Sequence, residues 1–188
     1  MGARDGRVIG IDPGSRTTGW GVVERAGGRI VRVASGVIRT RPDDPMPTRL
    51  QAIHLGLAEA IRTYLPTAAA MEEIFAHKSA ASALVLGQAR GVALLAVAGL
   101  PLGTYNAVTV KNTVAGSGRA EKEQVARMVC TLLGLELSVP LDETDALAIA
   151  LTHLSHGAMV PTAPVKRPRR MSARDQWTAI ALRAGVKT

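Results

Sequence analysis

The chain has 188 residues, enough for one domain with a sizeable hydrophobic core and a short tail. Its apolar content of 47% excludes an intrinsically disordered protein, and its single cysteine, Cys130, excludes a disulfide framework or a cysteine-based zinc cluster. The net charge of +8 predicts a polyanionic partner, although seven of the 23 basic residues and only one of the 15 acidic residues fall within 157–188. No signal-peptide pattern or membrane-length apolar run is visible, so we expect a cytoplasmic protein.

Three antiparallel strands are predicted at the start of the chain. The apolar run Val8–Asp12 is typical of a short buried strand, and the Asp-Pro-Gly sequence that begins at Asp12 is a strong turn signal. Residues 19–24 and 29–38 favour β structure, and the two glycines between them, Gly27 and Gly28, indicate a hairpin.

The rest of the chain alternates helices with strands and then continues in helices. In chain order we expect a helix that ends before Pro66, a strand at 68–75, a helix at 79–98, a strand at 102–105, and helices at 109–115, 120–133 and 143–156. Strand–helix–strand crossovers favour parallel pairing, so this order predicts an α/β domain with a mixed five-stranded sheet and helices on both faces. The domain is predicted to span 1–156, followed by a basic, proline-rich tail at 157–188 that is mobile or contains one short helix.

Four carboxylates lie at the edges of apolar runs. Asp12 ends the first strand, Glu72 directly follows three alanines and a methionine, and Asp142 and Asp145 open the last helix. Each has an ordinary explanation, because Asp12 could start a turn and Asp142 could cap a helix with Asp145 answering the helix dipole. Glu73 competes with Glu72, since neighbouring side chains on a strand face opposite sides, and the pattern alone leaves that choice open.

Taken together, the four acids predict a metal site. Asp142 and Asp145 are three residues apart and therefore share one helical face. Asp12 ends a strand that such a fold places near the centre of the sheet, where open α/β sheets carry out their chemistry. Oxygen ligands without cysteine or histidine favour a hard cation, Mg²⁺ or Mn²⁺, over zinc.

Five segments resemble the RuvC family of bacterial Holliday junction resolvases, from about Val8 to about His156: GIDPGSRTTGWG, MEEIF, LGQARGVALLA, GSGRAEKEQVARMV and DETDALAIALTH. The resemblance implies an RNase H-like fold and a homodimer that resolves four-way DNA junctions by symmetric paired nicks in recombination and repair. It also implies two-metal hydrolysis, with two Mg²⁺ ions for which Mn²⁺ can substitute, and products with 5′-phosphate and 3′-hydroxyl ends. The family's metal-binding acids fall on Asp12, Glu72, Asp142 and Asp145, which selects Glu72 over Glu73. RuvA and RuvB are partners implied by the family alone.

Further residues acquire roles only through this resemblance. It assigns Lys111 and Lys122 to DNA contact and Lys122 also to catalysis, whereas a lone lysine is ordinarily a solvated surface residue. It suggests that Phe75 stacks on an unpaired base, whereas core packing is the ordinary role of a phenylalanine at a strand end. The small residues Ala83, Gly87 and Gly91 would lie in a dimer interface, or else pack onto the protein's own sheet. His153 is expected to be a surface or capping residue.

Other functions are compatible with parts of this pattern. An actin-like ATPase also begins with a strand and a phosphate-binding turn, but it needs a second domain for which 188 residues leave no room. An RNase H-like nuclease acting on structured RNA shares the early turn. A non-catalytic junction-binding protein would not need all four acids.

Overall fold

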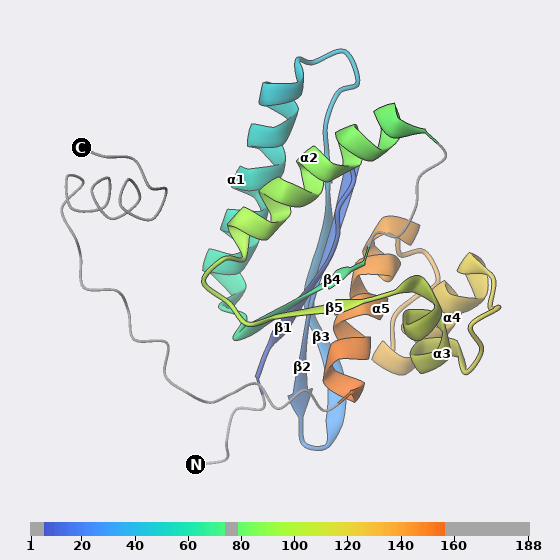
Figure 1. The fold of residues 1–188 in the computed structure, drawn as a ribbon. Helices are drawn as coiled ribbons and strands as arrows, with labels where there is room; N and C mark the ends of the chain where they lie inside the picture. Colours follow the sequence, from blue (N-terminus) through green and yellow to red (C-terminus); the bar gives the residue numbers. More distant parts are fainter. Residues whose placement is uncertain (1–5, 74–78, 157–188) are drawn as a thin grey trace, which may run out of the picture.

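The computed structural model describes residues 6–73 and 79–156, and within these ranges the chain forms a mixed five-stranded sheet in the order β3-β2-β1-β4-β5 (Figure 1). Three strands are antiparallel neighbours: β1 (Val8–Asp12), β2 (Thr17–Ala26) and β3 (Arg29–Arg39). The other two, β4 (Ala68–Glu72) and β5 (Leu102–Tyr105), continue the sheet in parallel with β1. The predicted fold class is confirmed.

Helices cover both faces of this sheet. One face carries α1 (Met46–Tyr64) and α2 (Ala80–Ala96), and the other carries α3 (Ala107–Ala115), α4 (Lys122–Leu133) and α5 (Leu141–Ser155) (Figure 1). Alternate side chains of one strand enter different cores: Ile9 packs against the α1–α2 layer and Val8 against the α3–α5 layer. None of the described helices is long and apolar enough to cross a membrane.

The last helix begins earlier than the sequence indicates. Pro140 is its N-cap, without a side-chain capping bond, and the helix starts at Leu141. Asp142 therefore lies in the first turn, where its carboxylate is available for other contacts, and the alternative in which it caps the helix is excluded. Proline favours this start because its fixed φ suits a helix N-terminus and it has no N–H to satisfy.

A trough of three glycines lets α5 lie directly on the sheet. Gly10 of β1 faces the backbone of α5 at Ala146, and a β-carbon there would collide with the Ala146 carbonyl oxygen. Gly19 of β2 faces the Asp142 carbonyl oxygen in the same way, and Gly21 faces the side chain of Leu147. Any larger residue would hold the helix away from the strands. The trough therefore fixes the height of α5 above the ends of β1 and β2.

Candidate metal centre

Three of the four predicted acids converge at the end of β1. Oxygen atoms of Asp12, Asp142 and Asp145 all lie within 4.8 Å of one another. Asp12 is the last residue of β1, and it pairs in the sheet with Gly19, the glycine on which the first turn of α5 rests. Two separate parts of the chain thus deliver carboxylates to one point because the sheet has no side chain between them.

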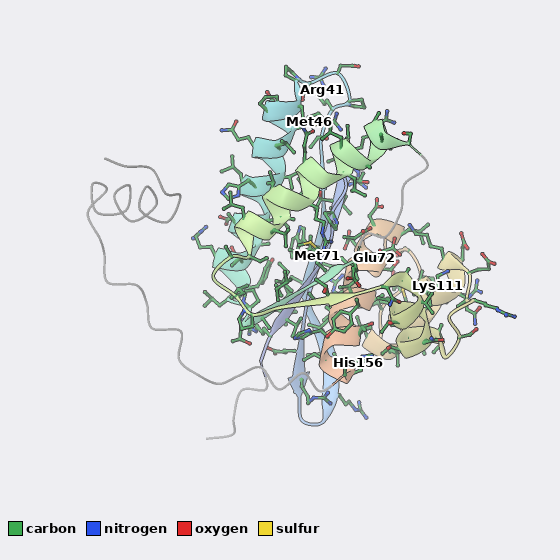
Figure 2. All side chains as sticks on the ribbon, viewed as in Figure 1. Arg41, Met46, Met71, Glu72, Lys111 and His156 are labelled. Carbon is green, nitrogen blue, oxygen red and sulfur yellow. The ribbon has the colours of Figure 1, made fainter. Side chains whose placement is uncertain are left out.

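Glu72 approaches the same point from the neighbouring strand. β4 is parallel to β1, so both strands end at one edge of the sheet. Met71 is fully buried in the α1–α2 core, and Glu72 therefore points to the opposite face of the sheet, toward the α3–α5 layer (Figure 2). Asp12 faces the same layer, because its neighbour Ile11 lies in the α1–α2 core. Glu73 lies beyond the end of the strand and is exposed. Glu72 is outside the tight group of three acids but lines a pocket of about 250 Å³ with Asp145, Lys111 and Lys122.

Burial, followed by the proximity of the other acids, raises the proton affinity of three of these carboxylates. Burial, followed by the charges of Asp145 and Glu72, raises the pKa of Asp12 to about 7, against the opposing effect of Lys122. Burial and the charge of Asp145 also raise the pKa of Glu72. The pKa of Asp145 is raised mainly by burial, although its hydrogen bond with Lys122 opposes the shift. A bound cation would remove the repulsion among these buried carboxylates.

Lys122 partly neutralises the cluster from the start of α4. Its Nζ lies 2.6 Å from Asp145 Oδ2, and half of its side chain is exposed. This hydrogen bond is the main reason why the pKa of Lys122 is raised. Lys111, on α3, lines the same pocket. Phe75 lies outside the described residues, so its predicted role in base stacking stays a prediction.

The donor set fits a hard divalent cation. The converging atoms are carboxylate oxygens, and the group contains no histidine or cysteine among the described residues. Mg²⁺ and Mn²⁺ prefer such ligands, whereas zinc and copper sites use nitrogen or sulfur. The raised pKa of Asp12 agrees with this fit, because burial and the neighbouring acids disfavour its charged form, and a bound cation would offset both effects.

A family model described as crossover junction endodeoxyribonuclease RuvC matches residues 8–153, which include all four acids. The chain belongs to the RuvC family. RuvC of Myxococcus xanthus is 49% identical over 172 residues, covering 89% of this chain and 90% of that protein. RuvC of Syntrophotalea carbinolica is 50% identical over 149 residues, covering 78% of this chain and 92% of that protein.

Solved structures agree with this membership. T. thermophilus RuvC, in complex with a Holliday junction substrate, superposes with a TM-score of 0.76 at 39% identity, over 82% of this chain and 96% of that chain. The yeast mitochondrial resolvase Ydc2 shares the fold, with a TM-score of 0.58 at 13% identity over 79% of each chain. The predicted family, fold and class of enzyme, a nuclease, are confirmed.

Two features of this RuvC site escaped the sequence analysis. Arg90 of α2 donates a hydrogen bond to the carbonyl oxygen of Glu72, and its charge acts to lower the pKa of Glu72. The sequence offered one sign of this contact, because Arg90 is the only charged residue in a helix made mostly of small and apolar residues. His153 was expected to be a surface or capping residue, but it is buried, the C-cap is His156, and the His153 Nδ1 lies 2.9 Å from the hydroxyl of Tyr105. That expectation is wrong because α5 is buried along its whole inner face, as far as its last turn.

Proposed function

We propose that this RuvC-family protein resolves four-way DNA junctions by symmetric paired nicks that leave 5′-phosphate and 3′-hydroxyl ends. The observation that carries the proposal is the convergence of Asp12, Asp142 and Asp145 within 4.8 Å, with Glu72 on the adjacent strand. The family match and the similarity to an RuvC bound to a Holliday junction substrate support a junction rather than another nucleic acid. We place the activity in the cytoplasm, in DNA recombination and repair.

The residues divide the chemistry between them. Asp12, Asp142 and Asp145 would hold Mg²⁺ or Mn²⁺, and Glu72 would complete the set for a second ion. Bound divalent cations supply an activated water and stabilise charge on the leaving 3′-oxygen. The protein contributes fixed carboxylates whose mutual repulsion favours cation binding. It also contributes a half-exposed ammonium at Lys122, beside Asp145, that would stabilise negative charge on a bound phosphate.

Cleavage of synthetic substrates tests this function directly. With Mg²⁺ or Mn²⁺, we expect paired nicks in a four-way DNA junction and little cleavage of linear duplex DNA or of structured RNA of similar length. Cleavage of the RNA in preference to the junction would favour an RNA nuclease instead. Tight junction binding without nicks in either metal would favour a non-catalytic binding protein.

Removal of the Lys122 charge is expected to slow nicking without weakening metal binding. In Lys122→Met, the ammonium that pairs with Asp145 is lost, so competition for that carboxylate falls while stabilisation of phosphate charge is lost. We expect a roughly 10²-fold lower single-turnover rate and equal or tighter Mn²⁺ binding by calorimetry. Arg119→Met, which removes an exposed cation from the nearby loop, is the matched control. Nicking by Lys122→Met at the rate of the control would contradict the assignment.

The homodimer is proposed from the outer face of α2. A β-carbon at Gly87 or Gly91 would meet no described residue within 4 Å, so these glycines face away from the core, into which α2 places Ala89 and Ala93. Leu84 and Leu95, near the ends of this face, are 65% and 66% exposed. Glycines and exposed leucines on one face allow close approach of a second copy, and twofold symmetry suits paired nicks. RuvA and RuvB remain partners expected from the family.

A bulky residue on this face should disrupt the dimer. Gly91→Leu is expected to shift the protein toward monomers in sedimentation at micromolar concentration, because the side chain prevents close backbone approach, while its fold is retained. Thr131→Leu is the control: it adds a leucine at an exposed position of α4, on the other side of the sheet, and should leave the oligomeric state unchanged. If both variants sediment as wild type, the interface lies elsewhere.

A further inference from the structure

Arg49 is a buried arginine without a carboxylate partner among the described residues. It lies near the start of α1 and is 9% exposed. Its Nη2 donates to the carbonyl oxygen of Ser15 at 2.6 Å, and its Nε donates to Thr40 Oγ1 at 3.3 Å. The Thr40 hydroxyl in turn donates to the same Ser15 oxygen at 2.6 Å. The guanidinium therefore binds the Ser15 carbonyl oxygen directly and also through the Thr40 hydroxyl.

That turn connects Asp12 to β2. Three successive carbonyl groups of the turn accept hydrogen bonds. Thr18 Oγ1 donates to the Gly14 carbonyl at 2.8 Å, and the Thr40 amide donates to the Arg16 carbonyl at 3.0 Å. The Ser15 carbonyl between them accepts from Arg49 and from the Thr40 hydroxyl. A pocket of about 350 Å³ lies between Ser15 and the first turns of α2, so this helix does not brace the turn. Arg49 and Thr40 supply the support.

Stability alone does not call for an arginine at this position. Burial of a guanidinium without a carboxylate carries a large desolvation cost, which charge-assisted bonds to carbonyl oxygens only partly offset. Its place near the N-terminus of α1 adds a second cost, because the helix dipole is positive there. An apolar side chain would fill the space at lower cost. The contacts of Arg49 therefore indicate a task in holding the turn.

We propose that Arg49 is a positioning residue for the metal centre: it anchors the Ser15 carbonyl and thereby fixes the direction in which Asp12 presents its carboxylate to Asp142 and Asp145. Asp12 is flanked by β1 on one side and by this turn on the other, so a loose turn leaves its backbone free on one side. Among the described residues, the hydrogen bonds of Arg49 go to Ser15 and Thr40 and to none of the four acids, so we expect it to act through the backbone. The inference rests on the proposed metal-dependent nuclease function.

Four variants separate positioning from simple stability. Arg49→Met keeps the volume and removes all donors, Arg49→Lys keeps one cationic donor, and Thr40→Val removes the hydroxyl that shares the Ser15 oxygen. The fourth combines Arg49→Met with Thr40→Val. Leu57→Ala is the control, because it destabilises the same helix α1 through its buried core face. For each, we would measure Mn²⁺ binding by calorimetry, the unfolding temperature, junction binding without metal, and the single-turnover nicking rate.

Arg49→Met is expected to weaken Mn²⁺ binding and slow nicking, each by roughly 10- to 100-fold, as outer-sphere partners of metal ligands do. Junction binding should stay within about twofold of wild type. Arg49→Lys should recover part of both losses. In the double variant, the fold-loss of Mn²⁺ affinity should be smaller than the product of the two single fold-losses, because both side chains act on the Ser15 carbonyl. Leu57→Ala should lower the unfolding temperature while metal affinity is unchanged.

Wild-type Mn²⁺ affinity in Arg49→Met, or an equal loss in Leu57→Ala, would overturn the inference. If Arg49→Met does not fold, Arg49→Lys and Thr40→Val decide by the same measurements, and wild-type affinity in both overturns it. The metal measurement also separates this inference from the proposed function. If the wild-type protein binds Mn²⁺ but does not nick junctions, the four-way junction is not its substrate. A weakened Mn²⁺ affinity in Arg49→Met would still support the positioning role in that case.

Discussion

Asp12→Asn is expected to reduce junction nicking by roughly 10³-fold or more and, in the metal-free protein, to raise the temperature of unfolding. The first effect follows from the loss of a ligand at the point where three carboxylates meet. The second follows from the removal of a carboxylate whose charge is opposed by burial and by the charges of Asp145 and Glu72. Asparagine has a similar shape and no charge.

The gain in stability should depend on pH in a defined direction. The pKa of Asp12 is raised from 3.8 to about 7 in the folded chain, so between these values the folded state binds more protons than the unfolded state. The free energy of unfolding of the wild type therefore falls as pH rises from about 4 to about 7, and the asparagine variant lacks this loss. At pH 8 the difference should be on the order of 1–4 kcal/mol, and it should vanish near pH 4.

Thermal unfolding in EDTA at several pH values measures this difference. A gain of 1 kcal/mol corresponds to roughly 2–4 °C for a chain of this size. Addition of Mn²⁺ should reverse the order, because the wild type binds the ion better and is stabilised by it. An Asp12→Asn protein that nicks junctions at the wild-type rate would remove Asp12 from the catalytic set. If the variant is less stable than wild type at pH 8 without metal, the ionised Asp12 carboxylate does not destabilise the folded protein.

The strands and the place of the acids could be predicted because their signals are local. The apolar run Val8–Asp12, ended by the turn sequence, indicated both the strand and the carboxylate at its end. The choice between Glu72 and Glu73 could not be made from the pattern, because alternation on a strand says only that the two face opposite sides. It depends on which side of β4 faces α5, a property of the assembled sheet.

The contacts that complete the site depend on distant segments and left little signal in the sequence. Gly19 looked like one residue of a β-rich stretch, and its role becomes visible only when α5 lies on it. Arg49 was not singled out in the sequence, because its contact with Ser15 spans 34 residues; it is buried under the turn that follows Asp12. The bond between Lys122 and Asp145 joins the start of α4 to α5, and periodicity within either helix does not encode it.

Gly19→Ala is expected to disable the site without removing any functional group. The added methyl group would fall on the carbonyl oxygen of Asp142, and backbone atoms cannot rotate away as a side chain can. The start of α5 must therefore move off the sheet, and Asp142, in the first turn, and Asp145, directly after it, move with it. Because Gly19 is the sheet partner of Asp12, the displacement acts at the point where the three acids meet.

We expect at least a roughly 10²-fold loss of nicking, since a misplacement of about 1 Å at a catalytic group has such effects. Overpacking should also lower stability by about 1–3 kcal/mol. Gly21→Ala is the matched control: it adds the same methyl group two residues along the same strand and beneath the same helix, where the nearest atoms belong to the Leu147 side chain. It should lose similar stability and keep most of its Mn²⁺ affinity and activity.

Metal affinity distinguishes displacement of the acids from general destabilisation. In calorimetry well below the unfolding temperature of both variants, Gly19→Ala should bind Mn²⁺ much more weakly than Gly21→Ala. Equal affinities would mean that α5 adapts by bending beyond its first turn, so that Asp142 and Asp145 return to Asp12. Weak binding by Gly19→Ala alone would mean that the absence of one β-carbon, as much as the presence of the carboxylates, determines whether a cation can bind at this edge of the sheet.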